Sequence, residues 1–255
     1  MMDFKPAERL LPVFVRWPML QINNLSKTYQ GGKKAVDGLS LEVCPGDIFG
    51  FIGHNGAGKT TTIRAVTGVL AFEEGEIRIN GKDLRREPVL CKSMMAYIPD
   101  NPDLYEHLTG IQYLNFIGDI FRIPKGERVE RIRGFADRFE LTADLGDLIA
   151  SYSHGMKQKL AIIGALIHQP RLLVLDEPFV GLDPKAAFTL KTIMHELCGQ
   201  GCAIFFSTHI LEVAERLCNK IAIIRKGRLA ACGPTDQVRG DGSLESMFLE
   251  LIDHE

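Results

Sequence analysis

The stretch GHNGAGKTT, residues 53–61, decides the fold of this chain. It matches the pattern GxxxxGK[ST] and lies in the context that gives this pattern its meaning. The apolar run DIFGFI at 47–52 precedes it as a strand, and KTTTIRAVTGVL at 59–70 follows as a helix. Consecutive backbone amides face inward in such a turn and the helix adds its N-terminal dipole, so the loop is predicted to bind phosphate. A glycine-rich turn with a chance GKT is the alternative, which the flanking strand and helix disfavour.

Each part of this loop has an expected role. The glycines permit the tight turn, Lys59 is expected to reach the β- and γ-phosphates of a nucleotide, and the Thr60 hydroxyl is expected to coordinate Mg²⁺. The loop residues predicted to contact the nucleotide are Gly53, His54, Asn55, Gly56, Ala57, Gly58, Lys59, Thr60 and Thr61.

A second motif, LLVLDEP at 172–178, is an apolar run that ends in two carboxylates. In a parallel sheet the carboxyl ends of the strands face the ligand. Asp176 therefore suits a role at the metal through water, and Glu177 is placed to accept a proton from an attacking water. An acidic helix cap before Pro178 is the alternative, and the phosphate loop upstream makes the metal and base roles the better interpretation.

Apolar periodicity organises the rest of the chain. Short runs from residue 19 to 53 predict strands, and EIRINGKDL at 76–84 predicts a hairpin that turns at Asn80 and Gly81. Residues 89–155, approximately, are predicted to form a mostly helical insertion, in which the charged run RVERIRGFADR at 128–138 marks a solvated helix face. Strand and helix patterns alternate after residue 171, which predicts an α/β core with a parallel sheet covered by helices.

Composition excludes several classes of protein. The 255 residues are 45% hydrophobic with a formal net charge of −2, so the chain has material for a large core but no overall attraction for nucleic acid. The run LLPVFV at 10–15 is too short to span a bilayer, and no cleavage site follows it. The cysteines show neither CxxC spacing nor a His/Cys cluster, which favours reduced thiols in a cytoplasm over a zinc or redox site. They are Cys44, Cys91, Cys198, Cys202, Cys218 and Cys232.

The order of these motifs resembles that of the ATP-binding cassette (ABC) ATPases over about residues 19–235. The segment SYSHGMKQKL at 151–160 lies where that family has its signature sequence, usually Leu-Ser-Gly-Gly-Gln. Ser153 and Gly155 match the signature, whereas His154 and the residues at 152 and 156 do not. GLDP at 181–184 resembles the D-loop of the family, and STHI at 207–210 resembles its switch-histidine segment.

The resemblance implies roles for residues outside the phosphate loop. Tyr29 lies where the family stacks an aromatic ring on adenine, and His209 is implied to sense the γ-phosphate. Two subunits of the family pair head to tail, so Ser153 and Gly155 are implied to bind the γ-phosphate held by the other subunit. Ordinary packing of Tyr29 and a structural hydrogen-bonding role for His209 are the alternatives.

The sequence departs from the family at Asp100, in the segment YIPDNPD at 97–103. The family usually has glutamine after this proline, where the side chain contacts Mg²⁺ or the attacking water. An aspartate can also ligate Mg²⁺, although it is shorter and carries a charge. The alternative is that Asp100 caps a turn, because Asp, Asn and Pro are strong turn formers.

The implied fold class is α/β, a P-loop NTPase of the ABC type with a mainly parallel sheet core, an antiparallel β subdomain and an inserted helical subdomain. The expected division is an N-terminal extension at 1–18, an ABC ATPase domain at 19–235 with its helical subdomain at about 89–155, and a C-terminal tail at 236–255. The implied cofactors are ATP and Mg²⁺, and catalysis is assigned to Lys59, Glu177 and His209. Thr60, Asp100 and Asp176 are the expected metal ligands.

The implied function is that of an ATPase subunit of an ABC transporter, peripheral on the cytoplasmic face of the membrane. Its expected partners are separate membrane-spanning permease subunits and a second ABC ATPase subunit, in a homodimer or heterodimer, and no nucleic acid is expected. YEHLTG at 105–110 and the signature variant resemble the Ecs and bacitracin-type exporter groups. The alternative is a soluble ABC ATPase, either a scaffold of iron–sulfur assembly or a factor associated with nucleic acid or ribosomes.

Overall fold

The main sheet of the computed structural model, which describes residues 17–253, contains six strands in the order β10-β9-β3-β8-β7-β6. Neighbouring strands from β9 to β6 are parallel, and β10 pairs antiparallel at the edge. Their bounds are β3 (Ile48–Ile52), β6 (Met95–Ile98), β7 (Leu172–Asp176), β8 (Ala203–Thr208), β9 (Lys220–Arg225) and β10 (Arg228–Pro234). Because the parallel strands end at one edge, the loops that follow β3, β7 and β8 meet there.

A second, antiparallel sheet has the order β2-β1-β4-β5. Its strands are β1 (Leu20–Thr28), β2 (Lys34–Val43), β4 (Glu74–Ile79) and β5 (Lys82–Asp83). The predicted hairpin is confirmed, because β4 and β5 pair across Asn80 and Gly81, whose φ angles are 49° and 77°. Two positive φ values are what the favoured two-residue turn requires. Helix α1 (Lys59–Val66) and the main sheet share one buried cluster with this sheet.

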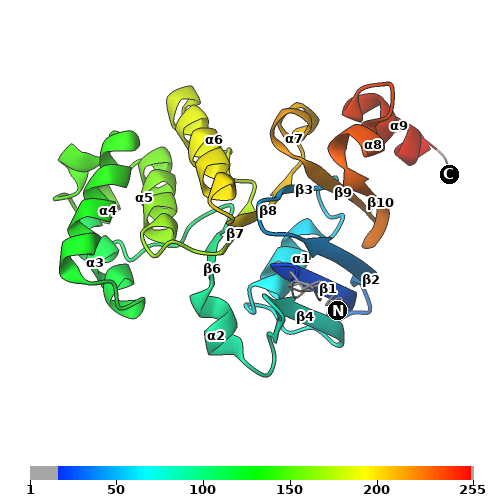
Figure 1. The fold of residues 1–255 in the computed structure, drawn as a ribbon, viewed down its shortest axis with the longest axis horizontal. Helices are drawn as coiled ribbons and strands as arrows, with labels where there is room; N and C mark the ends of the chain where they lie inside the picture. Colours follow the sequence, from blue (N-terminus) through cyan, green and yellow to red (C-terminus); the bar gives the residue numbers. More distant parts are fainter. Residues whose placement is uncertain (1–16, 254–255) are drawn as a thin grey trace, which may run out of the picture.

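The helical part lies at one end of the molecule in Figure 1. It contains α3 (Gly110–Ile120), α4 (Lys125–Arg138) and α5 (His154–Leu166), with short 3₁₀ turns between α4 and α5. Thr109 and Gln112 form a capping box that begins α3. The sequence predicts a solvated face on α4, and this prediction is wrong for Arg128. That residue is 7% exposed and donates to the Asp119 carboxylate at 2.6 Å.

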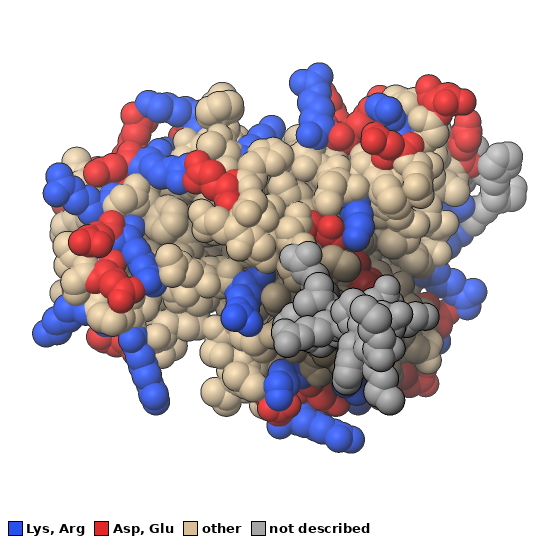
Figure 2. Space-filling view, in the orientation of Figure 1, with Lys and Arg blue, Asp and Glu red and all other residues tan. Residues whose placement is uncertain are grey.

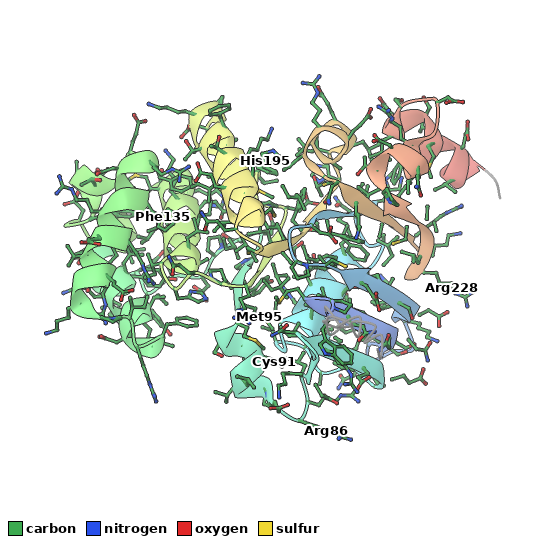
Figure 3. The ribbon with its side chains drawn as sticks, viewed as in Figure 1. Arg86, Cys91, Met95, Phe135, His195 and Arg228 are labelled. Carbon is green, nitrogen blue, oxygen red and sulfur yellow. The ribbon has the colours of Figure 1, made fainter. Side chains whose placement is uncertain are left out.

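The helical insertion expected at about 89–155 needs a correction, because residues 95–98 form strand β6 of the main sheet. Before β6 comes the short helix α2 (Pro88–Ser93). Figure 3 shows Cys91 on α2 and Met95 at the start of β6, and both belong to the cluster under the antiparallel sheet. Four residues are too few to reveal a strand by their periodicity, and β6 is recognisable only because it pairs with β7.

The remaining helices cover the other side of the main sheet and its far edge. They are α6 (Pro184–Gly199), α7 (Leu211–Leu217), α8 (Thr235–Arg239) and α9 (Leu244–Asp253). The sequence predicts a tail at 236–255, where the structure has α9 and most of α8. Leu244 and Phe248 of α9 belong to the main buried cluster. The expected N-terminal extension lies outside the described residues, apart from positions 17 and 18.

Charge is mixed over the face drawn in Figure 2, where Lys and Arg side chains alternate with Asp and Glu. Such a surface gives no single-sign field over that face. Within residues 17–253, no helix has both the length and the apolar character that crossing a membrane requires.

His168 joins the helical part to the main sheet. Its ring stacks on Phe121 at 3.7 Å between centroids, and Nε2 lies 3.3 Å from the Met95 carbonyl oxygen. Burial lowers the pKa of His168 to about 4. The unfolded chain, with a histidine pKa of about 6.5, therefore binds more protons than the folded chain between these values, and the free energy of unfolding falls as pH falls.

We expect His168→Phe to remove this contribution. Between pH 7 and pH 4.5, the wild-type unfolding free energy should fall by about 2 kcal/mol more than that of the variant. Urea unfolding at a series of pH values measures the difference, and His195→Phe on the exposed side of α6 is the control (Figure 3). Parallel curves for wild type and His168→Phe would contradict the assignment.

Candidate nucleotide-binding and catalytic site

The phosphate loop between β3 and α1 is packed so closely that two of its glycines have no substitute. Gly58 caps α1 with φ 114°, and a Cβ there would lie 2.5 Å from the Ala35 carbonyl oxygen. A Cβ at Gly53 would lie 2.6 Å from the Ile224 carbonyl oxygen. The backbone of β2 and β9 therefore fixes the start and the end of the loop.

Lys59 is the first residue of α1 and is 6% exposed. Its ammonium donates to the carbonyl oxygens of Gly53 at 2.6 Å and His54 at 3.3 Å. It also lies 3.5 Å from Glu177 Oε1. The loop thus holds a buried cation at its centre, beside a carboxylate from the next motif.

The two acidic residues at the end of β7 are linked by one hydroxyl. Asp176 is 2% exposed and accepts a hydrogen bond from Ser207 Oγ at 2.5 Å. The same Ser207 oxygen accepts the Glu177 N–H at 3.0 Å. The sequence alone assigns no role to Ser207. Its place in STHI, at the end of an apolar strand, is the signal that could have found it, and the structure pairs it with Asp176 in the β7–β8 register.

The backbone of Glu177 is held in a conformation that is unfavourable for a residue with a side chain. Its φ of 50° lies in the left-handed region, which costs a non-glycine residue about 1 kcal/mol. His209 Nδ1 lies 3.0 Å from Glu177 Oε2, whereas the buried Oε1 has no hydrogen-bond partner. The Lys59 ammonium, 3.5 Å from Oε1, is too distant for a good hydrogen bond, so this oxygen keeps the capacity to bind a water and accept its proton.

One cavity of about 260 Å³ brings most of the predicted residues together. The predicted residues that line it are Tyr29, His54, Asn55, Gly56, Gly58, Lys59, Thr60, Thr61, Asp100, Asp176 and Glu177. Lys33 and Ala35 line it too and were missed, since nothing in the sequence marks them. Gly53 and Ala57 belong to the loop but do not line the cavity. His209 does not line it either, but its Nδ1 contacts Glu177, which does.

Tyr29 lines this cavity and is 40% exposed, and its hydroxyl lies 3.2 Å from Thr61 Oγ1. Lys27 Nζ lies 5.8 Å from the ring centroid. A tethered, accessible aromatic ring beside the phosphate loop is a platform on which a flat base can stack.

The donors in the cavity fit Mg²⁺. Thr60, Asp100 and Asp176 offer one hydroxyl and two carboxylates, which are hard oxygen ligands. Within the described part of the chain, no group of three or more His, Cys, Asp or Glu side chains could hold a metal by itself. Mg²⁺ commonly uses one or two carboxylates together with water and substrate phosphates, so this donor set suits a metal that arrives with a nucleotide.

If Asp100 is a metal ligand, Asp100→Asn should raise the Mg²⁺ concentration needed for half-maximal ATPase activity by roughly threefold to tenfold, because a charged ligand becomes neutral. Asp100→Gln restores the usual family residue and should keep basal hydrolysis. A Mg²⁺ titration checks both variants. The control is Asp103→Asn, since Asp103 is exposed in the same turn but does not line the cavity. Superimposable curves for wild type and Asp100→Asn would leave Asp100 as a turn residue.

The signature turn does not reach this cavity. Ser153 is exposed, and its hydroxyl accepts the Met156 N–H at 3.3 Å as the N-cap of α5. A Cβ on Gly155 would lie 3.0 Å from the carbonyl oxygen of Gly181, and a Cβ on Gly181 would lie 2.6 Å from the His154 ring. Ser153 and Gly155 therefore lie beside the GLDP segment of their own chain, away from its phosphate loop.

Comparison with known proteins identifies the family. Residues 36–180 match the family model described as ABC transporter. The chain is 35% identical over 238 residues to the ABC-type transporter ATP-binding protein EcsA of Bacillus subtilis (strain 168), which covers 91% of this chain and 96% of EcsA. It is 35% identical over 215 residues to the linearmycin resistance ATP-binding protein LnrL of the same organism, covering 84% of this chain and 69% of LnrL.

Solved structures agree with this relationship. The ATP-binding subunit of an ABC transporter is 35% identical with a TM-score of 0.88, over 92% of this chain and 100% of that one. A dimeric cassette bound to ADP and Pi in a post-hydrolysis state is 21% identical with a TM-score of 0.78, which shows a shared fold. The chain therefore belongs to the ABC transporter family. It is an ATP-binding subunit that hydrolyses ATP with Mg²⁺, as the sequence predicts.

Proposed function

We propose that two copies of this chain pair head to tail and hydrolyse ATP at sites that each copy completes for the other. The position of Ser153 and Gly155 carries this proposal. They lie at the N-terminus of α5, outside the cavity of their own phosphate loop, where backbone amides favour an anion. The cassette bound to ADP and Pi, which shares this fold, is described as dimeric, and pairing of two copies is proposed here by analogy.

The phosphates in this proposal are bound by the amides of residues 53–60 and by Lys59. Thr60, Asp100 and Asp176 would hold Mg²⁺, which when bound would neutralise charge on the phosphate oxygens. Tyr29 stacks on the adenine. These residues orient the substrate before any bond breaks.

The proton transfer is assigned to Glu177. Its Oε1 accepts a proton from a water whose oxygen bonds to the γ-phosphorus, and the bond from that phosphorus to the bridging oxygen breaks, which releases ADP and inorganic phosphate. The Glu177 N–H donates to Ser207 Oγ at 3.0 Å and so fixes the backbone of the base. His209 Nδ1, 3.0 Å from Glu177 Oε2, holds the other carboxylate oxygen. Its role as a sensor of the γ-phosphate is the one that the family resemblance implies. The signature turn of the second copy then closes the site.

The second part of the proposal concerns the membrane. In this proposal the chain works at the cytoplasmic face with separate permease subunits and powers export. EcsA is named as a transporter ATP-binding protein and LnrL as a linearmycin resistance ATP-binding protein, and resistance to a compound is compatible with its export. A cavity of about 310 Å³ between β6, α3 and α5, lined by Pro102, Tyr113 and Phe121 among others, offers a contact for a membrane subunit. Phe116 and Ile120 are exposed on α3, 42% and 56% respectively.

Purification from detergent-solubilised membranes tests this part. We expect the wild-type chain to copurify with membrane-spanning subunits and the double variant Phe116→Glu/Ile120→Glu to lose them while it keeps basal ATPase activity. The control is Val129→Glu, at a position 65% exposed on α4. A chain recovered only from the soluble fraction, free of membrane proteins, would favour the soluble ABC ATPase instead.

A further inference from the structure

Helix α9 lies next to two elements of the nucleotide site. Figure 1 shows α8 and α9 at the end of the molecule opposite α3 and α4, beside α7 and the β9–β10 edge. None of the motifs assigned from the sequence includes these two helices.

The first contact of α9 is with the phosphate loop. Phe248 is 8% exposed, and its ring lies 4.9 Å from the His54 ring, centroid to centroid, with the two planes tilted by 53°. The Leu251 carbonyl accepts a hydrogen bond from Arg225, the last residue of β9. A cavity of about 340 Å³ separates the rest of this helix face from the loop. The contact between the Phe248 and His54 rings therefore joins α9 to the phosphate loop beside this cavity.

The second contact of α9 is with the helix that follows the switch histidine. Helix α7 begins at Leu211, two residues after His209. Its Glu215 carboxylate accepts the N–H of Leu244, the first residue of α9, at 3.0 Å and pairs with Arg239 of α8 at 3.2 Å. Leu244 is fully buried, so the start of α9 is fixed to α7.

The backbone of His54 links the ring contact to the chemistry. Its carbonyl oxygen lies 3.3 Å from Lys59 Nζ, so a shift of residue 54 changes the surroundings of the ammonium that binds phosphate. The carbonyls at 53 and 54 are also the hydrogen-bond acceptors that hold this ammonium.

We infer that Phe248 is a positioning residue for nucleotide binding, which holds His54 and through it the phosphate loop in the geometry that binds ATP, with α9 anchored on α7. The inference requires the ATP-binding activity of the family but neither the pairing of two copies nor a membrane partner. It places residues 235–253 in the working ATPase unit.

The test is a pair of neighbouring substitutions on α9 in the full chain. Phe248→Ala should raise the KM for ATP roughly threefold to tenfold with kcat little changed, because it removes a contact made equally before and during the reaction. Phe248→Tyr keeps the ring and should restore the wild-type KM. Leu249→Ala, at a position 52% exposed on the same helix, is the matched control and should leave KM unchanged.

A double-substitution cycle separates positioning from general stability. If Phe248 acts through His54, the KM of the His54→Ala/Phe248→Ala variant should be no higher than that of the worse single variant. Effects that multiply, or a Phe248→Ala variant that melts at a lower temperature with an unchanged KM, would overturn the inference. Should Phe248→Ala not fold, Phe248→Leu retains apolar volume without a ring, and the same criteria apply to it.

Discussion

Glu177→Gln should reduce kcat for ATP hydrolysis by about 10²- to 10⁴-fold, which is the usual contribution of a general base. Glutamine keeps the shape of the side chain but accepts no proton at the position of Oε1, the buried oxygen without a hydrogen-bond partner. Nucleotide binding should survive, because Lys59 and the loop amides are unchanged. With ATP and Mg²⁺ present, size-exclusion chromatography should therefore show an accumulated dimer.

Glu212→Gln is the control for this experiment, since Glu212 is 72% exposed on α7 and pairs with Arg216 on the surface. It should turn over ATP at the wild-type rate and show no additional dimer. If the Glu177→Gln variant also keeps the wild-type rate, Glu177 is not the base.

Lys59→Ala should lower kcat/KM by at least about 100-fold, because a preorganised cation on the transferring phosphate is lost. In contrast to the effect at Glu177, nucleotide binding itself should weaken. Lys59 is 6% exposed and its ammonium donates to the carbonyl oxygens of Gly53 and His54, so its removal also takes a buried donor from the loop backbone.

Equilibrium binding of ATP, measured by titration calorimetry, separates this result from a loss of the chemical step alone. Lys125→Ala, which removes an exposed lysine at the start of α4, is the control and should bind ATP normally. Wild-type affinity in Lys59→Ala would contradict the position assigned to the ammonium.

Local patterns were sufficient for the parts of the fold that local chemistry determines. Gly53 and Gly58 have no substitute where the β9 and β2 backbones approach them, and the Asn80–Gly81 turn needs positive φ values. Both signals are visible in a single segment of sequence. The family, the fold class and the ATPase activity followed from the order of such segments, and the comparisons confirm them.

Long-range contacts determine what the sequence did not reveal. Arg128 is buried because Gly118 of α3 leaves room for its guanidinium, since a Cβ on Gly118 would lie 2.4 Å from Arg128 Nε. Ser207 acquires its role only beside β7, and Phe248 acquires its role only when α9 meets the phosphate loop. Strand β6 is a strand through its pairing. The roles assigned to the site residues remain predictions, and the substitutions described above test them.

The central claim is that each site is completed by the signature turn of a second copy, and complementation between two inactive variants tests it most directly. Ser153→Arg disables the signature turn and Lys59→Ala disables the phosphate loop. In a head-to-tail heterodimer both defects fall in one composite site, and the other site is intact.

The measurement is the ATPase rate of an equimolar mixture of the two variants, compared with each variant alone. Random pairing makes half of the dimers mixed with one working site each, so the mixture should recover up to about one quarter of the wild-type rate. Crosslinking of differently tagged copies shows that heterodimers have formed. No recovery in a mixture that contains those heterodimers would contradict the head-to-tail site.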